Sequence, residues 1–224
     1  MSKYIKDLIF SGEGLNLDFK YAITDSRKIA RSLVAFANTQ GGKLLIGVKD
    51  NGNIVGVSSD EEYYMVQAAA QLYCKPEVLF TTKPWYIDGK TVLEIVVPES
   101  TNKPHMAERE GKWWAYIRVA DENQLANLVM INVWKKHKRV DGIKMSFSET
   151  EHALFKYLHE NEFITLSRFI KLCLIRRSEA IDILSSLVVL RVLEIVFKNN
   201  ETYYKQTEKN TLLNNQIKNW LHID

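Results

Sequence analysis

The residues of this 224-residue chain that are best suited to bind a ligand are three arginines. The first along the chain is Arg118. Tyr116 and Arg118 are two residues apart in an apolar run, so both side chains lie on the same side of a predicted strand. The planar guanidinium donors of Arg118 would fit a phosphate group. Pairing with a local acid such as Asp121 would explain the same arginine equally well. Phosphate contact and internal pairing are therefore both open for Arg118.

A second group, Arg176 and Arg177, stands just before a segment with helical periodicity. Arginines at such a position are well placed to contact backbone phosphates. The outer face of this segment also carries Glu179 and Asp182, which would repel phosphate, and residues 146–224 contain ten basic and ten acidic side chains. A DNA-reading unit usually has a basic excess, so docking or dimerisation is an alternative role for this part of the chain.

Backbone amides offer a third kind of binding chemistry. Residues 38–42, Asn-Thr-Gln-Gly-Gly, join a helical segment to a buried strand. Glycines allow left-handed geometry and close approach of the backbone, and bare amides can receive a phosphate. The same glycines are expected in a helix C-cap and a fold-defining turn, which is the role we favour. Lys20 and Lys43 would supply unspecific positive charge.

The segments that must position these residues alternate between helical and strand patterns. Apolar residues recur at helical spacing over 29–38, and a continuous apolar run at 44–48 predicts a strand buried on both faces. Asn51-Gly52 predicts a tight hairpin turn. Further patterns predict a helix over 59–73, strands over 78–87, 91–97 and 113–119, and a helix over 122–136. This order indicates an α+β (α/β) fold with a mixed, largely antiparallel sheet.

A second set of elements follows the basic run Lys135–Arg139. Ser148 and Glu151 have the spacing of a capping box, and Thr165 and Ser178 are candidate caps of two more short helices. Two strand-like runs around Asn199-Asn200 predict a β-hairpin. Three short helices and a hairpin predict a winged helix-turn-helix. The chain is accordingly divided into a domain at 1–134, a linker at 135–147 and a winged helix at 148–224.

An ordered series of motifs links the first domain to a known family. It comprises Gly12-Glu13-Gly14-Leu15-Asn16-Leu17-Asp18-Phe19-Lys20, Ala35-Phe36-Ala37-Asn38-Thr39-Gln40-Gly41-Gly42, Ile46-Gly47-Val48-Lys49-Asp50-Asn51-Gly52, Pro98-Glu99-Ser100, Lys103-Pro104-His105 and Tyr116-Ile117-Arg118-Val119. Over roughly the first 130 residues, the series closely resembles the Schlafen AlbA-type domain, a family regarded as nucleic-acid binding. The resemblance implies that this chain binds nucleic acid.

The same resemblance raises an enzymatic alternative. In the ribonuclease branch of the Schlafen family, acids at the positions of Glu13, Asp18 and Asp50 form a metal-dependent cleavage centre. Three clustered carboxylates can hold Mg or Mn and activate water. Asp18 is one methylene shorter than the usual Glu, and Asp50 also has a simple turn role beside Asn51-Gly52. A structural use of these acids is the interpretation that we favour.

The sequence lacks the motifs of several other functional classes. Gly41-Gly42-Lys43-Leu44 has neither the spacing nor the hydroxyl of a phosphate loop, so ATPase activity is not expected. The two cysteines, Cys74 and Cys173, have no zinc-ligand spacing, and no histidine lies in a GxSxG or HExxH context. No run approaches the roughly 20 apolar residues of a membrane helix. We expect a cytoplasmic protein without membrane contact or a required cofactor.

The sequence therefore favours a nucleic-acid-binding protein, specifically a DNA-binding transcriptional regulator, with DNA a more probable partner than RNA. Its candidate nucleic-acid contacts are Lys20, Lys43, Arg118, Arg176 and Arg177. The first alternative is a metal-dependent nuclease that acts on RNA through Glu13, Asp18 and Asp50. The second is a homodimeric interaction module. The net charge of +3 neither requires nor excludes a nucleic-acid partner.

Overall fold

The computed structural model describes residues 2–57, 60–138, 148–207 and 211–221. The chain forms two compact units, Met1–Ala126 and Asn127–Asp224, and each is described by itself. None of the described helices is long and apolar enough to cross a membrane.

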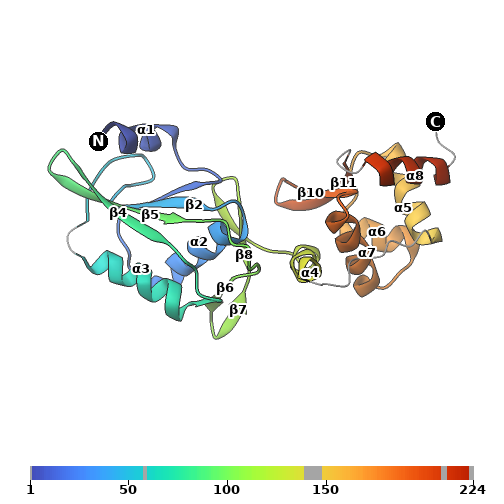
Figure 1. Ribbon diagram of the computed structural model, residues 1–224, viewed down its shortest axis with the longest axis horizontal. Helices are drawn as coiled ribbons and strands as arrows, with labels where there is room; N and C mark the ends of the chain where they lie inside the picture. Colours follow the sequence, from blue (N-terminus) through green and yellow to red (C-terminus); the bar gives the residue numbers. More distant parts are fainter. Residues whose placement is uncertain (1, 58–59, 139–147, 208–210, 222–224) are drawn as a thin grey trace. The chain divides into compact units, whose positions relative to one another are not determined.

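The first unit is built on a mixed four-stranded sheet with the strand order β1-β2-β5-β4 (Figure 1). Its strands are β1 (Leu17–Lys20), β2 (Gly42–Ile46), β4 (Thr81–Ile87) and β5 (Lys90–Val97). Strands β1 and β2 are parallel, whereas the β2–β5 and β5–β4 pairs are antiparallel. The helices of this unit are α1 (Ser2–Ser11), α2 (Ser26–Asn38) and α3 (Glu61–Leu72). The predicted α+β class with a largely antiparallel sheet is confirmed.

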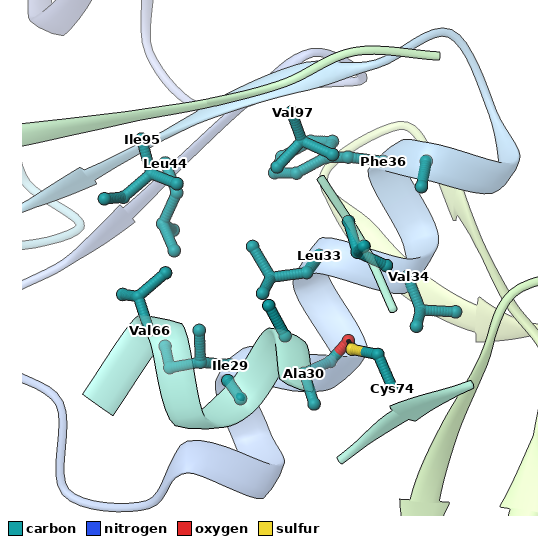
Figure 2. Close-up of a cluster of buried hydrophobic side chains, with 14 of the residues drawn as sticks. Ile29, Ala30, Leu33, Val34, Phe36, Leu44, Val66, Cys74, Ile95 and Val97 are labelled. Atoms are coloured by element: carbon teal, nitrogen blue, oxygen red, sulfur yellow. Dashed lines mark hydrogen bonds between the residues drawn. The ribbon is translucent and has the colours of Figure 1, made fainter. Parts of the chain in front are cut away.

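Helix α2 supplies the centre of the first hydrophobic core. Asp25 caps its start by accepting a hydrogen bond from the Arg27 backbone N–H at 2.9 Å. Leu33 and Phe36 then lie on the buried side of the helix, opposite the strand residue Val97 (Figure 2). A Cβ atom added at Gly42 would stand 2.2 Å from the Phe36 ring. Glycine at this position therefore lets β2 start directly beside the end of α2.

Two smaller sheets complete the first unit. One has the order β3-β6-β7, from β3 (Cys74–Lys75), β6 (Met106–Arg109) and β7 (Lys112–Trp114), and the other pairs β8 (Tyr116–Val119) with β9 (Glu122–Leu125). The strand predicted over 113–119 is thus two strands separated by Ala115. The hairpin predicted at Asn51-Gly52 consists of a turn and one isolated bridge, Val48 to Ile54. The first residues of the helix predicted from Glu122 belong to β9 because they pair with β8.

The second unit contains the predicted succession of three helices and a hairpin. Its elements are α4 (Leu128–His137), α5 (Glu149–Glu160), α6 (Leu166–Cys173), α7 (Arg177–Val189), β10 (Leu193–Lys198), β11 (Glu201–Gln206) and α8 (Thr211–Leu221). The capping box of Ser148 and Glu151 is present, and Thr165 caps α6. Ser178 does not cap α7, which begins at Arg177 without a side-chain cap. Phe155, Phe169 and Tyr204 lie in the second core. The assignment of this unit as a winged helix stays a prediction.

Helix α4 belongs to this second unit, whereas the sequence analysis ended the first domain at residue 134. Val129 is buried in the second core, and the ammonium group of Lys136 contacts α7. These contacts depend on residues about fifty positions further along the chain, so the local pattern of residues 122–136 does not reveal them. Most of the predicted linker, residues 139–147, lies outside the described residues.

Candidate nucleic-acid interface

Arg118 lies inside the first unit rather than on its surface. Its side chain is 2% exposed. Nε donates to the Gly14 carbonyl at 3.1 Å, Nη1 to the Asn123 side chain at 3.1 Å, and Nη2 to the Leu17 carbonyl at 3.2 Å. Nη2 is also 3.5 Å from the Asp18 carboxylate. The guanidinium therefore joins β8 to the segment around β1, and its acidic partner is Asp18 rather than Asp121.

Glu13 and Asp18 form a hydrogen-bonded pair of carboxyl groups. Burial and, second, the neighbouring Asp18 carboxyl raise the pKa of Glu13, and the hydrogen bond from the Phe19 backbone N–H lowers it by less. Together these effects bring the pKa of Glu13 to about 7. Burial alone would raise the pKa of Asp18, but its hydrogen bond with Glu13 and the charges of Lys20 and Arg118 outweigh burial and lower that pKa. Asp18 is therefore the ionised member of the pair, whereas Glu13 is about half protonated near pH 7.

Asp50, the third candidate metal ligand, does not join this pair. It is exposed in the turn that follows β2. Among the described residues, no group of three or more His, Cys, Asp or Glu side chains is placed to hold a metal ion. The three-carboxylate site of the nuclease alternative is therefore not assembled, because the Asn51-Gly52 turn holds Asp50 away from the buried pair. Structural use of Asp18, in contrast, agrees with its three side-chain contacts.

Lys20 and Lys43 both have partners on the protein. Lys20 Nζ donates to Asp18 at 3.0 Å and to the Phe19 carbonyl at 2.6 Å. Lys43 Nζ donates to the Tyr4 hydroxyl at 2.8 Å, and that hydroxyl donates to Glu94 at 2.6 Å.

Lys43 also borders an open pocket of about 580 Å³. The pocket is lined by Leu8, Ser11, Gly12, Glu13, Gly14, Asn16, Leu17, Gln40, Gly41, Gly42, Lys43, Val96, Val97, Pro98 and Glu99. Two acids, Glu13 and Glu99, therefore line this pocket together with Lys43.

The Asn38–Gly42 turn uses its amides internally. The Thr39 and Gly41 N–H groups both donate to the Phe36 carbonyl, at 3.1 and 2.9 Å. A Cβ atom at Gly41 would lie 2.7 Å from the Val97 carbonyl oxygen, and Gly41 has a positive φ of 71°. These features agree with the fold-defining turn that the sequence analysis favoured.

The polar motif residues around this turn form one buried hydrogen-bond network. The Asn38 side chain donates to the carbonyls of His105 and Tyr116, both at 2.8 Å, and accepts from the His105 N–H. The Thr39 hydroxyl donates to the Ala35 carbonyl and accepts from the Arg118 N–H. His105 is held further by Ser100, whose Oγ lies 2.7 Å from its Nε2. These polar motif residues thus hold strands and loops to the end of α2.

The start of α7 presents a different arrangement of cations. Arg176 and Arg177 are exposed, and two further exposed cations, Arg168 and Lys171, lie on α6 immediately before them. No acidic residue occurs between positions 163 and 178. We call these four residues the α6–α7 corner. Arg176 and Arg177 were predicted from the sequence, whereas Arg168 and Lys171 were not, although the absence of acids from this run is visible in the sequence.

The outer face of α7 beyond the corner is covered by α4. Lys136, buried on α4, donates from Nζ to the Asp182 carbonyl at 2.8 Å and to the Ser186 hydroxyl at 2.5 Å, and it forms an ion pair with the Asp182 carboxylate at 2.8 Å. Asn132 donates to Ser185 at 3.3 Å. Within the second unit, the corner therefore leaves the N-terminal end of α7 accessible, while the middle of the helix packs against α4.

One protein family and two solved structures are similar to this chain. The model of the family described as Schlafen, AlbA_2 matches residues 13–127, about half of the chain. Among solved structures, the DIP2311 protein from Corynebacterium diphtheriae is similar at 14% identity with a TM-score of 0.45, over 92% of this chain and 55% of that protein. The N-terminal domain of a RecG-related protein from Nitrosomonas europaea is similar at 23% identity with a TM-score of 0.39, over 54% of this chain and 91% of that domain. No curated protein matches the chain.

Proposed function

Because the chain belongs to the Schlafen, AlbA_2 family, we propose that it is a nucleic-acid-binding protein and, more specifically, a DNA-binding transcriptional regulator. The family as a whole is regarded as nucleic-acid binding. In our proposal DNA is the preferred partner, and the α6–α7 corner of the second unit makes the main contact with its phosphates.

The main support for this proposal is a group of four exposed cations in a stretch of sequence that contains no acidic residue. Arg168, Lys171, Arg176 and Arg177 are all exposed, and no residue from 163 to 178 is acidic. The described residues give none of the four an ion-pair partner. Such cations can release the counterions of a phosphate backbone without first breaking an internal salt bridge.

The regulatory part of the proposal rests on the order of elements in the second unit. Two helices joined by a short turn, α6 and α7, precede the β10–β11 hairpin, as in a winged helix-turn-helix. In such units the first helix crosses the DNA backbone, and the N-terminal residues of the second helix contact base edges in the major groove. Since α4 covers Asp182, Ser185 and Ser186 on α7, the corner is expected to contact phosphates rather than base edges.

A salt titration of DNA binding tests the proposal. The full chain is mixed with a fluorescein-labelled duplex of 30 base pairs, and the dissociation constant is followed by anisotropy at several salt concentrations. Changing Arg176 and Arg177 together to alanine should weaken binding and reduce the slope of log K against log salt by about 2, because each phosphate contact contributes about 0.9.

The control variant also removes two positive charges, but from other positions in the second unit. Lys156 and Lys218 are exposed on α5 and α8, and their double alanine variant should leave the slope unchanged. Equal slopes for the two double variants, or no binding by the parent protein at low salt, would contradict the proposal.

The metal-dependent ribonuclease has less support, because Asp50 does not meet Glu13 and Asp18. Incubating the protein with labelled RNA and Mg or Mn, alongside Asp50→Asn, tests it directly. The homodimeric module stays a prediction of the sequence, and light scattering of the purified chain measures its oligomeric state.

A further inference from the structure

A surface with three arginines lies beside the β6–β7 hairpin of the first unit and was not predicted from the sequence. The place of this hairpin in the fold is shown in Figure 1. A hollow of about 620 Å³ lies between the start of α2 and this hairpin. It is lined by Asp25, Arg27, Arg31, Glu108, Arg109, Glu110 and Gly111. From these residues and the adjacent Trp113, we infer that the first unit binds single-stranded nucleic acid, with a base stacked on Trp113 and a backbone phosphate in the arginine-lined hollow.

Trp113 is placed as a stacking surface. Tryptophan is usually well buried, but Trp113 is 40% exposed on the edge strand β7. It pairs across the strands with Glu108, which lines the hollow, and paired residues face the same side of a sheet. The Lys75 ammonium lies 5.9 Å from the centre of the Trp113 ring. Aromatic rings flanked by cations are a common means of binding single strands, whose unpaired bases are free to stack.

The acids of the hollow already have partners within the protein. Asp25 caps α2, and Glu108 accepts from Arg27 Nε at 3.0 Å and from the Gly111 N–H at 2.5 Å. Glu110 accepts from Arg109 Nε at 3.2 Å. Arg31 has no hydrogen bond or ion pair to any of the described residues, and Lys112 adds an exposed cation at the start of β7. Since Arg27 and Arg109 are paired with these acids, Arg31 and Lys112 are the cations that a phosphate would meet.

This inference goes beyond the proposed function, since it concerns another unit, another set of residues and another form of nucleic acid. A double helix offers its backbone but keeps its bases stacked on one another. The α6–α7 corner, which needs only phosphates, can bind either form, whereas a stack on Trp113 requires an unpaired base.

Anisotropy with the full chain tests the inference, using fluorescein-labelled 15-residue oligodeoxythymidylate, the matching oligouridylate and the 30-base-pair duplex. Trp113→Ala should weaken binding to the single strands about tenfold, because stacking on one aromatic ring contributes about 1–3 kcal/mol per base. It should leave duplex binding unchanged. Trp113→Tyr keeps an aromatic ring and should retain most of the affinity. The oligodeoxythymidylate and oligouridylate arms show whether the strand preferred is DNA or RNA.

Two further variants separate stacking from a structural effect. Trp114→Ala removes the neighbouring ring, which is 43% exposed but faces the other side of β7, and should not change single-strand binding. Arg31→Gln should lower the single-strand salt slope by about 0.7. Unchanged single-strand affinity in Trp113→Ala, or the same loss in Trp114→Ala, would overturn the inference. Neither result depends on the Arg176 and Arg177 variants, so the proposed function is judged separately.

Discussion

Arg118 in the first unit and Arg177 in the second have the same guanidinium group in opposite surroundings. Arg118 is enclosed by two carbonyls, Asn123 and Asp18, and its side chain is 2% exposed. Arg177 is exposed at the start of α7, in a run of residues without acids. An arginine motif therefore indicates ligand binding only where the guanidinium has no hydrogen-bond or ion-pair partners within the protein. A buried, paired guanidinium stabilises the fold, whereas an exposed one can attract a polyanion.

The largest expected effect tests the structural side of this comparison. Arg118→Ala should lower the free energy of unfolding of the first unit by roughly 3–5 kcal/mol, because it leaves the buried Asp18 carboxylate with only one of its two cationic partners and removes three hydrogen bonds of the guanidinium. Urea unfolding followed by circular dichroism measures the change.

Arg177→Ala is the matched variant in the second unit and should change stability by less than about 0.5 kcal/mol. Similar losses of stability in the two arginine variants would contradict the distinction between the buried and the exposed arginine. So would a folded Arg118→Ala protein with parental stability.

An intermediate effect is expected at Lys136, the buried cation of the second unit. Lys136→Ala removes the hydrogen bonds to Asp182 and Ser186 and the packing of the lysine stem, so the second unit should lose about 1–3 kcal/mol of stability. Lys135→Ala, at the exposed neighbouring position, is the control and should stay within about 0.5 kcal/mol. Equal stabilities of the two variants would show that α4 is not held to α7 by Lys136.

The smallest effect concerns the pH dependence of the first unit. Because the pKa of Glu13 is about 7 in the folded protein and about 4.5 without the fold, the folded state binds the proton more tightly. The stability contributed by this group is therefore complete below pH 4.5 and is lost as the pH rises through 7. Glu13→Gln should reduce the fall in urea midpoint between pH 5 and pH 8.

The lowered pKa of Asp18 acts at lower pH and in the opposite direction, since its contribution is present above its ordinary pKa and is lost on acidification. The pH 5 to 8 interval therefore avoids the titration of Asp18, and the comparison with Glu13→Gln shows which part of the change belongs to Glu13. A parental protein whose midpoint rises across this interval, or a variant with the same fall, would show that Glu13 is not the group responsible.

Local patterns in the sequence determined much of the secondary structure. The apolar spacing of α2, the capping box at Ser148 and the Asn199-Asn200 turn act over a few residues, so the order of most elements was predictable. The motif series of the first unit also identified its family. These features succeed because they depend on neighbours in the chain.

Tertiary structure alone decided which charged side chains are free. Arg118 meets Gly14 from 104 positions away, and Lys136 meets Ser186 from 50 positions away. The pairing of β7 with β6 places Trp113 beside the arginine-lined hollow. Periodicity and spacing show which side of an element a residue occupies, but not which distant segment covers that side. The burial and pairing of a charge depend on that distant segment, so the availability of each cation for a ligand was set by long-range packing.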